Sequence, residues 1–290
     1  MGAAAGGEQH ALQRLPPGQR TGDPRRRAPG GAAMNVKALN ECGVVVLGGS
    51  AGVGLETATQ FAEQGARVVV LGRNSERGQT AIASIGERTG TEAKFVRVDA
   101  TDPEDAVRAE QECRDHLGVI DVLVSTTGPS EPPRLLHTIA IENLRPRIEE
   151  IILPPLHMMH AVLPGMRAQG GGSIVNVASD AAKVATPGET AIGAAMAAIV
   201  MFSKAAALEV KREGVRINLL TPSLIANTPG AALIGGEPFS ARMFEKAAAM
   251  AHLGVVEPED LAAMAVYLSS PAAARITGQA ISVNGGISVA

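Results

Sequence analysis

The chain has 290 residues, of which 46% are apolar, and this is enough for a sizeable core in one α/β domain or two small ones. Aromatic residues make up only 2% and the net charge is -3, so stacking platforms for bases are scarce and no basic stripe for phosphate backbones appears in the predicted folded part. We therefore expect no nucleic-acid partner.

The segment before residue 34 differs in composition from everything that follows. Residues 1–33 are rich in Gly, Ala, Pro and Arg, and they show no helical or strand period. We predict a disordered tail over 1–33 and a folded domain over 34–290. No apolar run approaches the length of about 18 residues that a membrane span needs, so we expect a cytoplasmic protein without a membrane partner.

From residue 34 onward, strand-like apolar runs alternate with helical patterns. The run Gly43–Leu47 is continuously apolar, as is typical of a strand buried on both faces. Further strands are predicted at 67–71, 94–98, 120–124, 173–177, 216–220 and 280–283, and helices at 55–64, 103–117 and 187–212. This alternation predicts a single α/β domain with a parallel sheet and helices on both faces.

The first predicted strand runs into a glycine-rich turn. Gly48-Gly49-Ser50-Ala51-Gly52-Val53-Gly54 fits the spacing G-x-x-x-G-x-G between a strand and a helix. A backbone approaches a pyrophosphate closely only where side chains are absent, and the helix N-terminus adds free N–H groups and a positive dipole end. The turn therefore predicts a dinucleotide site.

The end of the second predicted strand indicates which dinucleotide binds. It reads Leu71-Gly72-Arg73-Asn74, without the acid that would bind the ribose hydroxyls of NAD and repel a 2′-phosphate. Arg73 offers a planar fork to that phosphate, and its alternative role is a solvated surface arginine. We expect NADP(H) as the preferred cofactor, with NAD(H) as the alternative.

Several later motifs agree in order and spacing with those of one family. Val98-Asp99-Ala100 follows the third strand, Ser125-Thr126-Thr127-Gly128 stands where Asn-Asn-Ala-Gly is usual, and Thr221-Pro222-Ser223 stands where Pro-Gly is usual. From about Cys42 to the C-terminus, the chain therefore resembles the short-chain dehydrogenase/reductase family. The resemblance implies a three-layer, Rossmann-type, doubly wound parallel sheet and a small-molecule substrate. It also implies cofactor contacts from Gly48, Ser50, Gly52, Val53, Gly54, Arg73, Asp99, Ala100, Thr126, Gly128, Pro222, Ser223 and Ile225.

The segment 173–196 has the layout of that family's active site but lacks most of its residues. Ser179 stands at the end of the fifth strand, where the family's Ser orients the carbonyl of the substrate. Thirteen residues later, the position of the proton-donating Tyr holds Ile192, and the position of the Lys that tunes it holds Met196. Ile151 occupies the place of an Asn that holds a relay water. Ser179 remains the one catalytic candidate, and its alternative role is a strand-end hydroxyl satisfied by backbone.

Nearby polar residues offer few substitutes. Lys183 lies in the loop after the fifth strand, either as a substrate-side cation or as a solvated residue. His157 and His160 share a helix face, but no third ligand accompanies them, and we expect no metal site. Pro155 lacks the N–H that would bond the carbonyl of Ile151, so that carbonyl is a candidate for holding a water.

Three functions are compatible with these residues. The first is an atypical NADP(H)-dependent oxidoreductase acting on a carbonyl or alcohol, the second is a cofactor-binding pseudoenzyme or regulatory subunit, and the third is a lyase or isomerase on the same fold. The helix 187–212 is rich in small residues and forms the dimer interface in the resembling family, so we expect a homodimer or homotetramer. The segments 130–135 and 226–243, expected to line the pocket, show no pattern diagnostic of one substrate.

Overall fold

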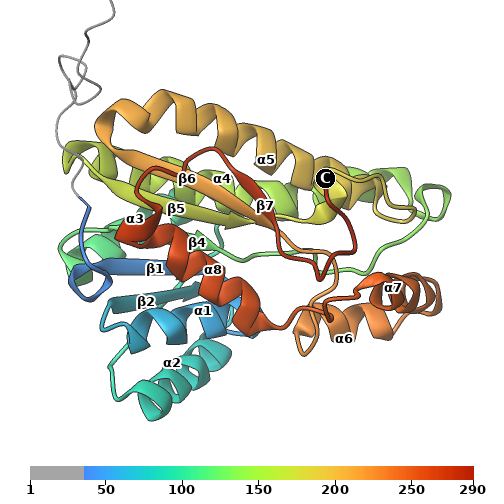
Figure 1. The fold of residues 1–290 in the computed structure, drawn as a ribbon, viewed down its shortest axis with the longest axis horizontal. Helices are drawn as coiled ribbons and strands as arrows, with labels where there is room; N and C mark the ends of the chain where they lie inside the picture. The colour runs from blue at the N-terminus through green and yellow to red at the C-terminus, as the bar shows by residue number, and fades with distance from the viewer. Residues whose placement is uncertain (1–35) are drawn as a thin grey trace, which may run out of the picture. The chain divides into compact units, whose positions relative to one another are not determined.

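A sheet of parallel strands forms the centre of the protein (Figure 1). The structure is a computed structural model that describes residues 36–290, so the tail predicted over 1–33 lies outside the described residues. The 7-stranded sheet has the order β3-β2-β1-β4-β5-β6-β7, and every neighbouring pair is parallel. The strands are β1 (Gly43–Leu47), β2 (Arg67–Gly72), β3 (Lys94–Arg97), β4 (Val122–Ser125), β5 (Gly172–Val177), β6 (Val215–Thr221) and β7 (Ala280–Ser282).

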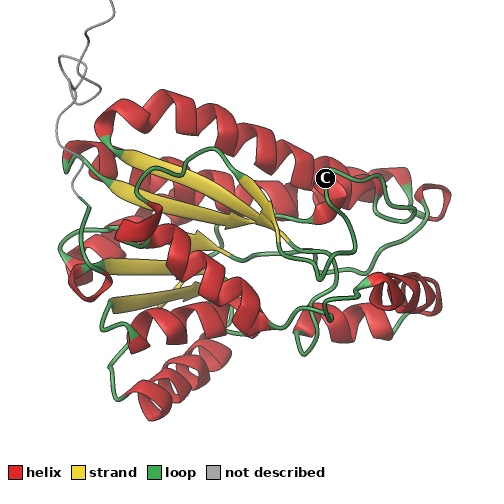
Figure 2. Cartoon of the chain, viewed as in Figure 1, coloured by secondary structure: helices red, strands yellow, loops and turns green. Residues whose placement is uncertain are grey.

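Helices cover both faces of this sheet and complete three layers (Figure 2). One face carries α1 (Gly52–Glu63), α2 (Ser75–Thr89) and α8 (Pro258–Ser269). The other carries α3 (Pro103–Leu117), α4 (Ile141–Ala168) and α5 (Thr190–Val210). Two further helices, α6 (Pro229–Gly235) and α7 (Pro238–Met250), follow β6 beyond the carboxyl ends of the strands (Figure 1). The predicted three-layer α/β fold is confirmed.

The alternation of side chains along the strands fills the two halves of the core. Val44 and Val46 of β1 belong to the apolar cluster under α1 and α8, whereas Val45 and Leu47 belong to the cluster under α3 and α4. All of β1 is buried, which explains why its sequence is a continuous apolar run and not an alternating one. The order of the sheet reverses between β1 and β4, and this reversal opens a crevice at their carboxyl ends.

Both cysteines are buried in this core. Burial raises the pKa of the Cys42 thiol to about 11 and that of the Cys113 thiol to about 12. Each thiol therefore stays protonated at neutral pH and serves as a small apolar side chain.

Two predicted helix starts were wrong, and glycines explain both. The helix expected to begin at residue 55 begins at Gly52, because the phosphate turn itself supplies the first turn of α1. The helix expected over 187–212 begins only at Thr190, because Gly188 has φ +86° and its left-handed backbone stops the helix from extending back to Pro187. Glu189 is thereby placed at the N-cap of α5.

Helix α5 also corrects the expectation that no apolar segment has membrane-spanning length. Within residues 36–290, the helical stretch Thr190–Glu213 is the one long and apolar enough to cross a membrane, although half of its apolar window is buried inside the protein. Lys204 interrupts the apolar run, so the run in the sequence is shorter than a membrane span. Its buried residues include Ile199 and Ala207, and the helix packs against α4 and β6, so we interpret it as a core helix.

Candidate active site

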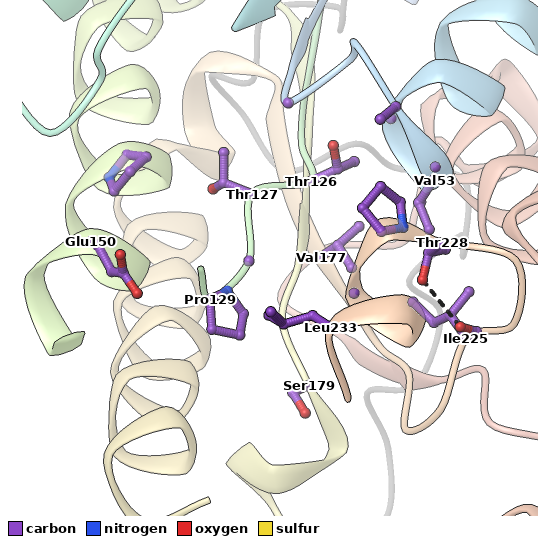
Figure 3. A pocket seen from close by; sticks show the side chains of 18 of the residues that line it. Val53, Thr126, Thr127, Pro129, Glu150, Val177, Ser179, Ile225, Thr228 and Leu233 are labelled. Atoms are coloured by element: carbon purple, nitrogen blue, oxygen red, sulfur yellow. Dashed lines mark hydrogen bonds between the residues drawn. The ribbon is translucent and has the colours of Figure 1, made fainter. Parts of the chain in front are cut away.

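A cavity of about 510 Å³ lies at the carboxyl ends of the strands, where the sheet order reverses. Every residue that the sequence predicts to contact the cofactor lines this one cavity, from the glycine turn to the segment after β6. The catalytic candidate Ser179 lines it as well. Figure 3 shows Ser179, Thr127 and Glu150 around the same hollow, contributed by the end of β5, the end of β4 and α4.

The glycine turn presents bare backbone to this cavity. Gly48 has φ +80°, and a Cβ on Gly54 would lie 2.3 Å from the carbonyl oxygen of Gly48 and 2.5 Å from Oγ1 of Thr126, so neither position accepts a side chain. Ala51 at the N-cap of α1 provides no side-chain hydrogen bond, and the first turn of α1 contains no acid. Free N–H groups and the positive end of the helix dipole therefore remain for an anion, which fits the pyrophosphate of a dinucleotide.

Two arginines stand at the edge of the cavity beyond β2. Arg73 and Arg77 both line it and are exposed, and neither guanidinium has a carboxylate partner within residues 36–290. The Asn74 side chain accepts a hydrogen bond from the Arg77 N–H at 2.9 Å and so caps α2. Arg73 was predicted from the sequence and Arg77 was not. Arg73 lies just before the N-cap Asn74 of α2 and Arg77 lies in the first turn of that helix.

The side of the cavity next to β3 presents a fixed carboxylate. Oδ1 of Asp99 accepts hydrogen bonds from the Thr101 N–H at 3.1 Å and the Thr101 hydroxyl at 2.7 Å. Its backbone N–H donates to Oδ2 of Asp105 at 2.7 Å. These bonds leave Oδ2 of Asp99 as the oxygen that is able to accept from a ligand.

Ser179 makes a backbone hydrogen bond and also lines the cavity. Its Oγ accepts a hydrogen bond from the Ala181 N–H at 3.2 Å and caps the short helix η3 (Asp180–Ala182), as a structural hydroxyl does. Within residues 36–290 its hydroxyl proton has no acceptor, and the side chain lines the cavity. Ser179 therefore keeps a hydrogen-bond donor for a bound carbonyl.

The three apolar replacements do not occupy equivalent places. Ile192 and Met196 line the cavity and are 3% and 4% exposed, so they form an apolar wall of it. Ile151 is buried behind them in the same apolar cluster and does not reach the cavity. Its neighbours Glu150 and Pro154 do reach it, and Glu150 accepts hydrogen bonds from the N–H and hydroxyl of Ser130 at 3.2 Å and 2.7 Å.

Lys183 is not a substrate-side cation in this structure. Its Nζ donates to Oγ of Ser282 at 2.5 Å and to the carbonyl oxygen of Ala290 at 2.6 Å, and the residue does not line the cavity. This ammonium links the loop after β5 to the segment around β7. Nδ1 of His157 lies 2.9 Å from the carbonyl oxygen of Ala100, which joins α4 to the loop after β3.

The structure adds two polar groups to the cavity that sequence reasoning missed. Oγ1 of Thr127 is buried without a hydrogen-bond partner in the described part of the chain. Glu189 also lines the cavity, and burial raises the pKa of its carboxyl to about 7. The only sequence signal for Glu189 was its position three residues before Ile192, which places both on one face of a helix.

The comparisons with known proteins agree with this geometry. A family model described as "Enoyl-(Acyl carrier protein) reductase" matches residues 48–288. The chain is 32% identical to 3-oxoacyl-[acyl-carrier-protein] reductase of Chlamydia trachomatis over 84% of this chain and 96% of that protein. It is 33% identical to cis-4-hydroxycyclohexanecarboxylate dehydrogenase of Sinomonas cyclohexanicum over 86% of this chain and 98% of that protein.

Solved structures show the same arrangement of elements. The structure of 7 alpha-hydroxysteroid dehydrogenase complexed with NADH and 7-oxo glycochenodeoxycholic acid superposes with a TM-score of 0.77, at 26% identity, over 86% of this chain and 97% of that one. Levodione reductase superposes with a TM-score of 0.79 at 22% identity, over 85% of this chain and 97% of that one, which shows the shared fold.

Proposed function

Because this chain belongs to the short-chain dehydrogenase/reductase family of oxidoreductases, we propose that it uses NADP(H) to interconvert a carbonyl and an alcohol group on a small molecule. One observation carries this proposal: a single cavity joins a bare glycine turn, two unpaired arginines and the free hydroxyl proton of Ser179. The names of the related proteins support it, since they are reductases of oxo groups or dehydrogenases of hydroxyl groups.

The residues of this chain divide the work between binding and chemistry. The N–H groups of the glycine turn would hold the pyrophosphate, and Oδ2 of Asp99 would accept from the adenine. Thr126 and Gly128 after β4, with Pro222, Ser223 and Ile225 after β6, would enclose the nicotinamide half. When bound, this cofactor supplies or accepts a hydride. Ser179 would donate a hydrogen bond to the carbonyl oxygen of the substrate and orient it.

We expect tighter binding of NADP(H) than of NAD(H), because Arg73 and Arg77 face no carboxylate and a 2′-phosphate supplies one charge-assisted bond to each. Such a bond contributes roughly 1.5–3 kcal/mol, so Arg73→Ala should weaken NADPH binding about tenfold or more, and the double variant with Arg77→Ala about a hundredfold. Fluorescence titration with NADPH and NADH measures both affinities.

Arg212→Ala is the control for this titration, since Arg212 is an exposed arginine of η4 (Lys211–Glu213) that does not line the cavity. It should leave both affinities unchanged. Equal wild-type affinities for NADPH and NADH, or an Arg73→Ala variant that loses NADH as strongly as NADPH, would refute the assignment of these arginines to the 2′-phosphate.

The apolar wall formed by Ile192 and Met196 supports a second candidate function, a protein that binds the cofactor without turnover. Ile192 and Met196 neither donate a proton nor carry a charge, so a cofactor-binding pseudoenzyme or regulatory subunit would show the same wall. The two candidates differ in turnover: the oxidoreductase oxidises NADPH in the presence of a ketone, whereas the pseudoenzyme binds NADPH without consuming it. A panel of cyclic ketones, oxo-steroids and 3-oxoacyl thioesters, followed by NADPH absorbance, distinguishes them.

We also propose a homodimer or homotetramer assembled through α5. Met201 and Leu208 on this helix are 67% and 64% exposed, which leaves large apolar side chains uncovered beside the small ones. Light scattering should give two or four times the mass of the chain, and Met201→Asp with Leu208→Asp should reduce it to one. Val107→Asp, which charges an equally exposed apolar site on α3, should not change the mass. A monomeric wild type contradicts the proposal.

A further inference from the structure

The proposed reaction needs a proton donor beside the substrate, and the wall where the family places one is apolar. Ile192 and Met196 form that wall and hold no exchangeable proton. Ser179 donates a hydrogen bond, but a serine hydroxyl does not ionise in the neutral range and its proton has to be replaced from another group. General acid catalysis requires a group within hydrogen-bond reach whose pKa lies near the working pH.

Glu189 is the ionisable side chain closest in the helix to the vacant position. It lies one helical turn before Ile192 and lines the same cavity as Ile192 and Ser179. Its backbone carbonyl accepts the first hydrogen bond of α5, from the Gly193 N–H at 2.5 Å, so its backbone is fixed. Its carboxyl makes no capping hydrogen bond to α5 and bonds instead with Thr186, which leaves its second oxygen able to act on a ligand.

The residue before Glu189 is held from two directions. Gly188 has φ +86°, and a Cβ there would lie 2.5 Å from the ring of Phe239 on α7. The carbonyl oxygen of Gly188 accepts the Arg134 N–H at 2.9 Å, which ties it to the segment between β4 and α4. These contacts determine where the Glu189 side chain starts, so the carboxyl is positioned by the fold and not by a bound ligand.

The surroundings keep this carboxyl partly protonated at neutral pH. Burial raises the pKa of Glu189 to about 7, a hydrogen bond with Thr186 opposes the rise, and the negative charge of Asp180 adds to it. Both the acid and its conjugate base are then present near pH 7, as a proton-transfer group requires. After proton loss, the N-terminus of α5 stabilises the carboxylate.

The other charged groups on the neighbouring elements do not neutralise Glu189. Asp180 of η3 is buried, and its Oδ1 has no hydrogen-bond partner in residues 36–290. Lys183 is engaged with the segment around β7. On the α7 side, the Glu237 carboxylate accepts the first N–H groups of that helix and is favoured in its ionised form by them and by Arg134.

We propose that Glu189 is the proton-transfer residue of this site, taking over the role that the apolar residue at position 192 cannot perform. The inference rests on the proposed oxidoreductase function. In reduction, a hydride from NADPH forms the C–H bond at the carbonyl carbon, and the carbonyl oxygen takes the proton of the Glu189 carboxyl. The products are the alcohol, NADP⁺ and the Glu189 carboxylate, which regains its proton from water at the cavity mouth. In oxidation the same carboxylate accepts the alcohol proton.

The test compares Glu189→Gln, which keeps the size of the side chain but transfers no proton, with the wild type. With cyclohexanone as the probe, wild-type kcat for reduction should fall as pH rises through about 7, because the reaction consumes the protonated form. Glu189→Gln should lower kcat roughly 100-fold to 10,000-fold and remove this pH dependence. Glu209→Gln, an exposed carboxylate on the same helix, should behave as the wild type.

A second readout does not depend on turnover. Carbon-13 NMR of protein labelled at the glutamate carboxyls should show one group titrating near pH 7 in the wild type, absent from Glu189→Gln, while both proteins bind NADPH equally. A wild type that does not bind NADPH would refute the proposed function itself. NADPH binding with equal turnover in wild type and Glu189→Gln, or with no group titrating near 7, would overturn the role of Glu189 alone. The role of Glu189 is also overturned if the wild type does not reduce cyclohexanone while the variant with Ile192→Tyr and Met196→Lys does.

Discussion

Gly52→Val is expected to abolish NADPH binding while leaving the protein folded. Gly52 opens α1 with φ +50°, and its Cβ would point to the rim of the cavity, 3.2 Å from Cδ of Pro229 at the start of α6. A valine there places two methyl groups between the glycine turn and α6, where the pyrophosphate has to lie. The loss of several charge-assisted bonds, each roughly 1.5–3 kcal/mol, should weaken binding at least about a hundredfold.

Two other glycines separate this effect from general damage. Gly90 has φ +70° with open space around its missing Cβ, so Gly90→Val introduces backbone strain of about 1–3 kcal/mol without touching the cavity and should bind NADPH normally. Gly54→Ala forces its Cβ to within 2.3 Å of a backbone oxygen and should lower the melting temperature as well as the affinity. Normal NADPH binding by a folded Gly52→Val variant would show that the turn is only structural.

Restoring the missing pair with Ile192→Tyr and Met196→Lys should raise the reduction of simple ketones, by roughly 100-fold or more where Glu189→Gln has removed the native acid. Both positions line the cavity one helical turn apart, so the phenol and the ammonium would stand as in the rest of the family. A free phenol has a pKa of about 10, and the lysine is needed to lower it, so Ile192→Tyr alone should gain less. The extra volume in this buried cluster should cost about 1–3 kcal/mol of unfolding free energy.

The decisive form of this experiment uses the Glu189→Gln background. If that variant is slow because it lacks an acid, the added Tyr-Lys pair should return turnover, followed as NADPH oxidation. Ile192→Phe with Met196→Lys provides the same ring without the hydroxyl and should not. Failure of the pair to raise ketone reduction in either background would show that the cavity around Ile192, Met196 and Pro154 has a geometry different from that of the family.

The sequence predicted the features of the cavity that depend on the backbone, such as the glycine turn at 48–54. It did not predict those that depend on tertiary packing, such as the burial of Glu189. Glycines at this spacing between a strand and a helix predicted a backbone turn at 48–54 that is open to a ligand, and Gly48, Gly52 and Gly54 do line the cavity. The predicted strand boundaries lie within two residues of the observed ones, because buried parallel strands are short continuous apolar runs that are easy to delimit in a sequence. Helix α4 continues through Pro154 and Pro155, and packing rather than propensity maintains it there.

Glu189 and Lys183 illustrate what the sequence could not reveal. The residues next to Glu189 in sequence do not indicate that it is buried. The preceding Gly188 lies against Phe239 of α7 and bonds to the segment between β4 and α4, and both are distant in sequence. Lys183 failed as a candidate for the converse reason: it lies near Ser179 in sequence, but its ammonium bonds to Ser282 and Ala290. Neighbouring positions in the sequence therefore predicted neither the place of Glu189 in the cavity nor the absence of Lys183 from its lining.

The buried thiols make this protein a convenient background for site-specific labelling. Cys42 and Cys113 are the only cysteines in the chain, and with pKa values of about 11 and about 12 they form almost no thiolate at neutral pH. A maleimide dye would therefore attach to a single cysteine introduced at Leu233, where α6 borders the cavity, without first removing the native ones. Fluorescence from that position would report ligand binding in the cavity in real time, in the native sequence background.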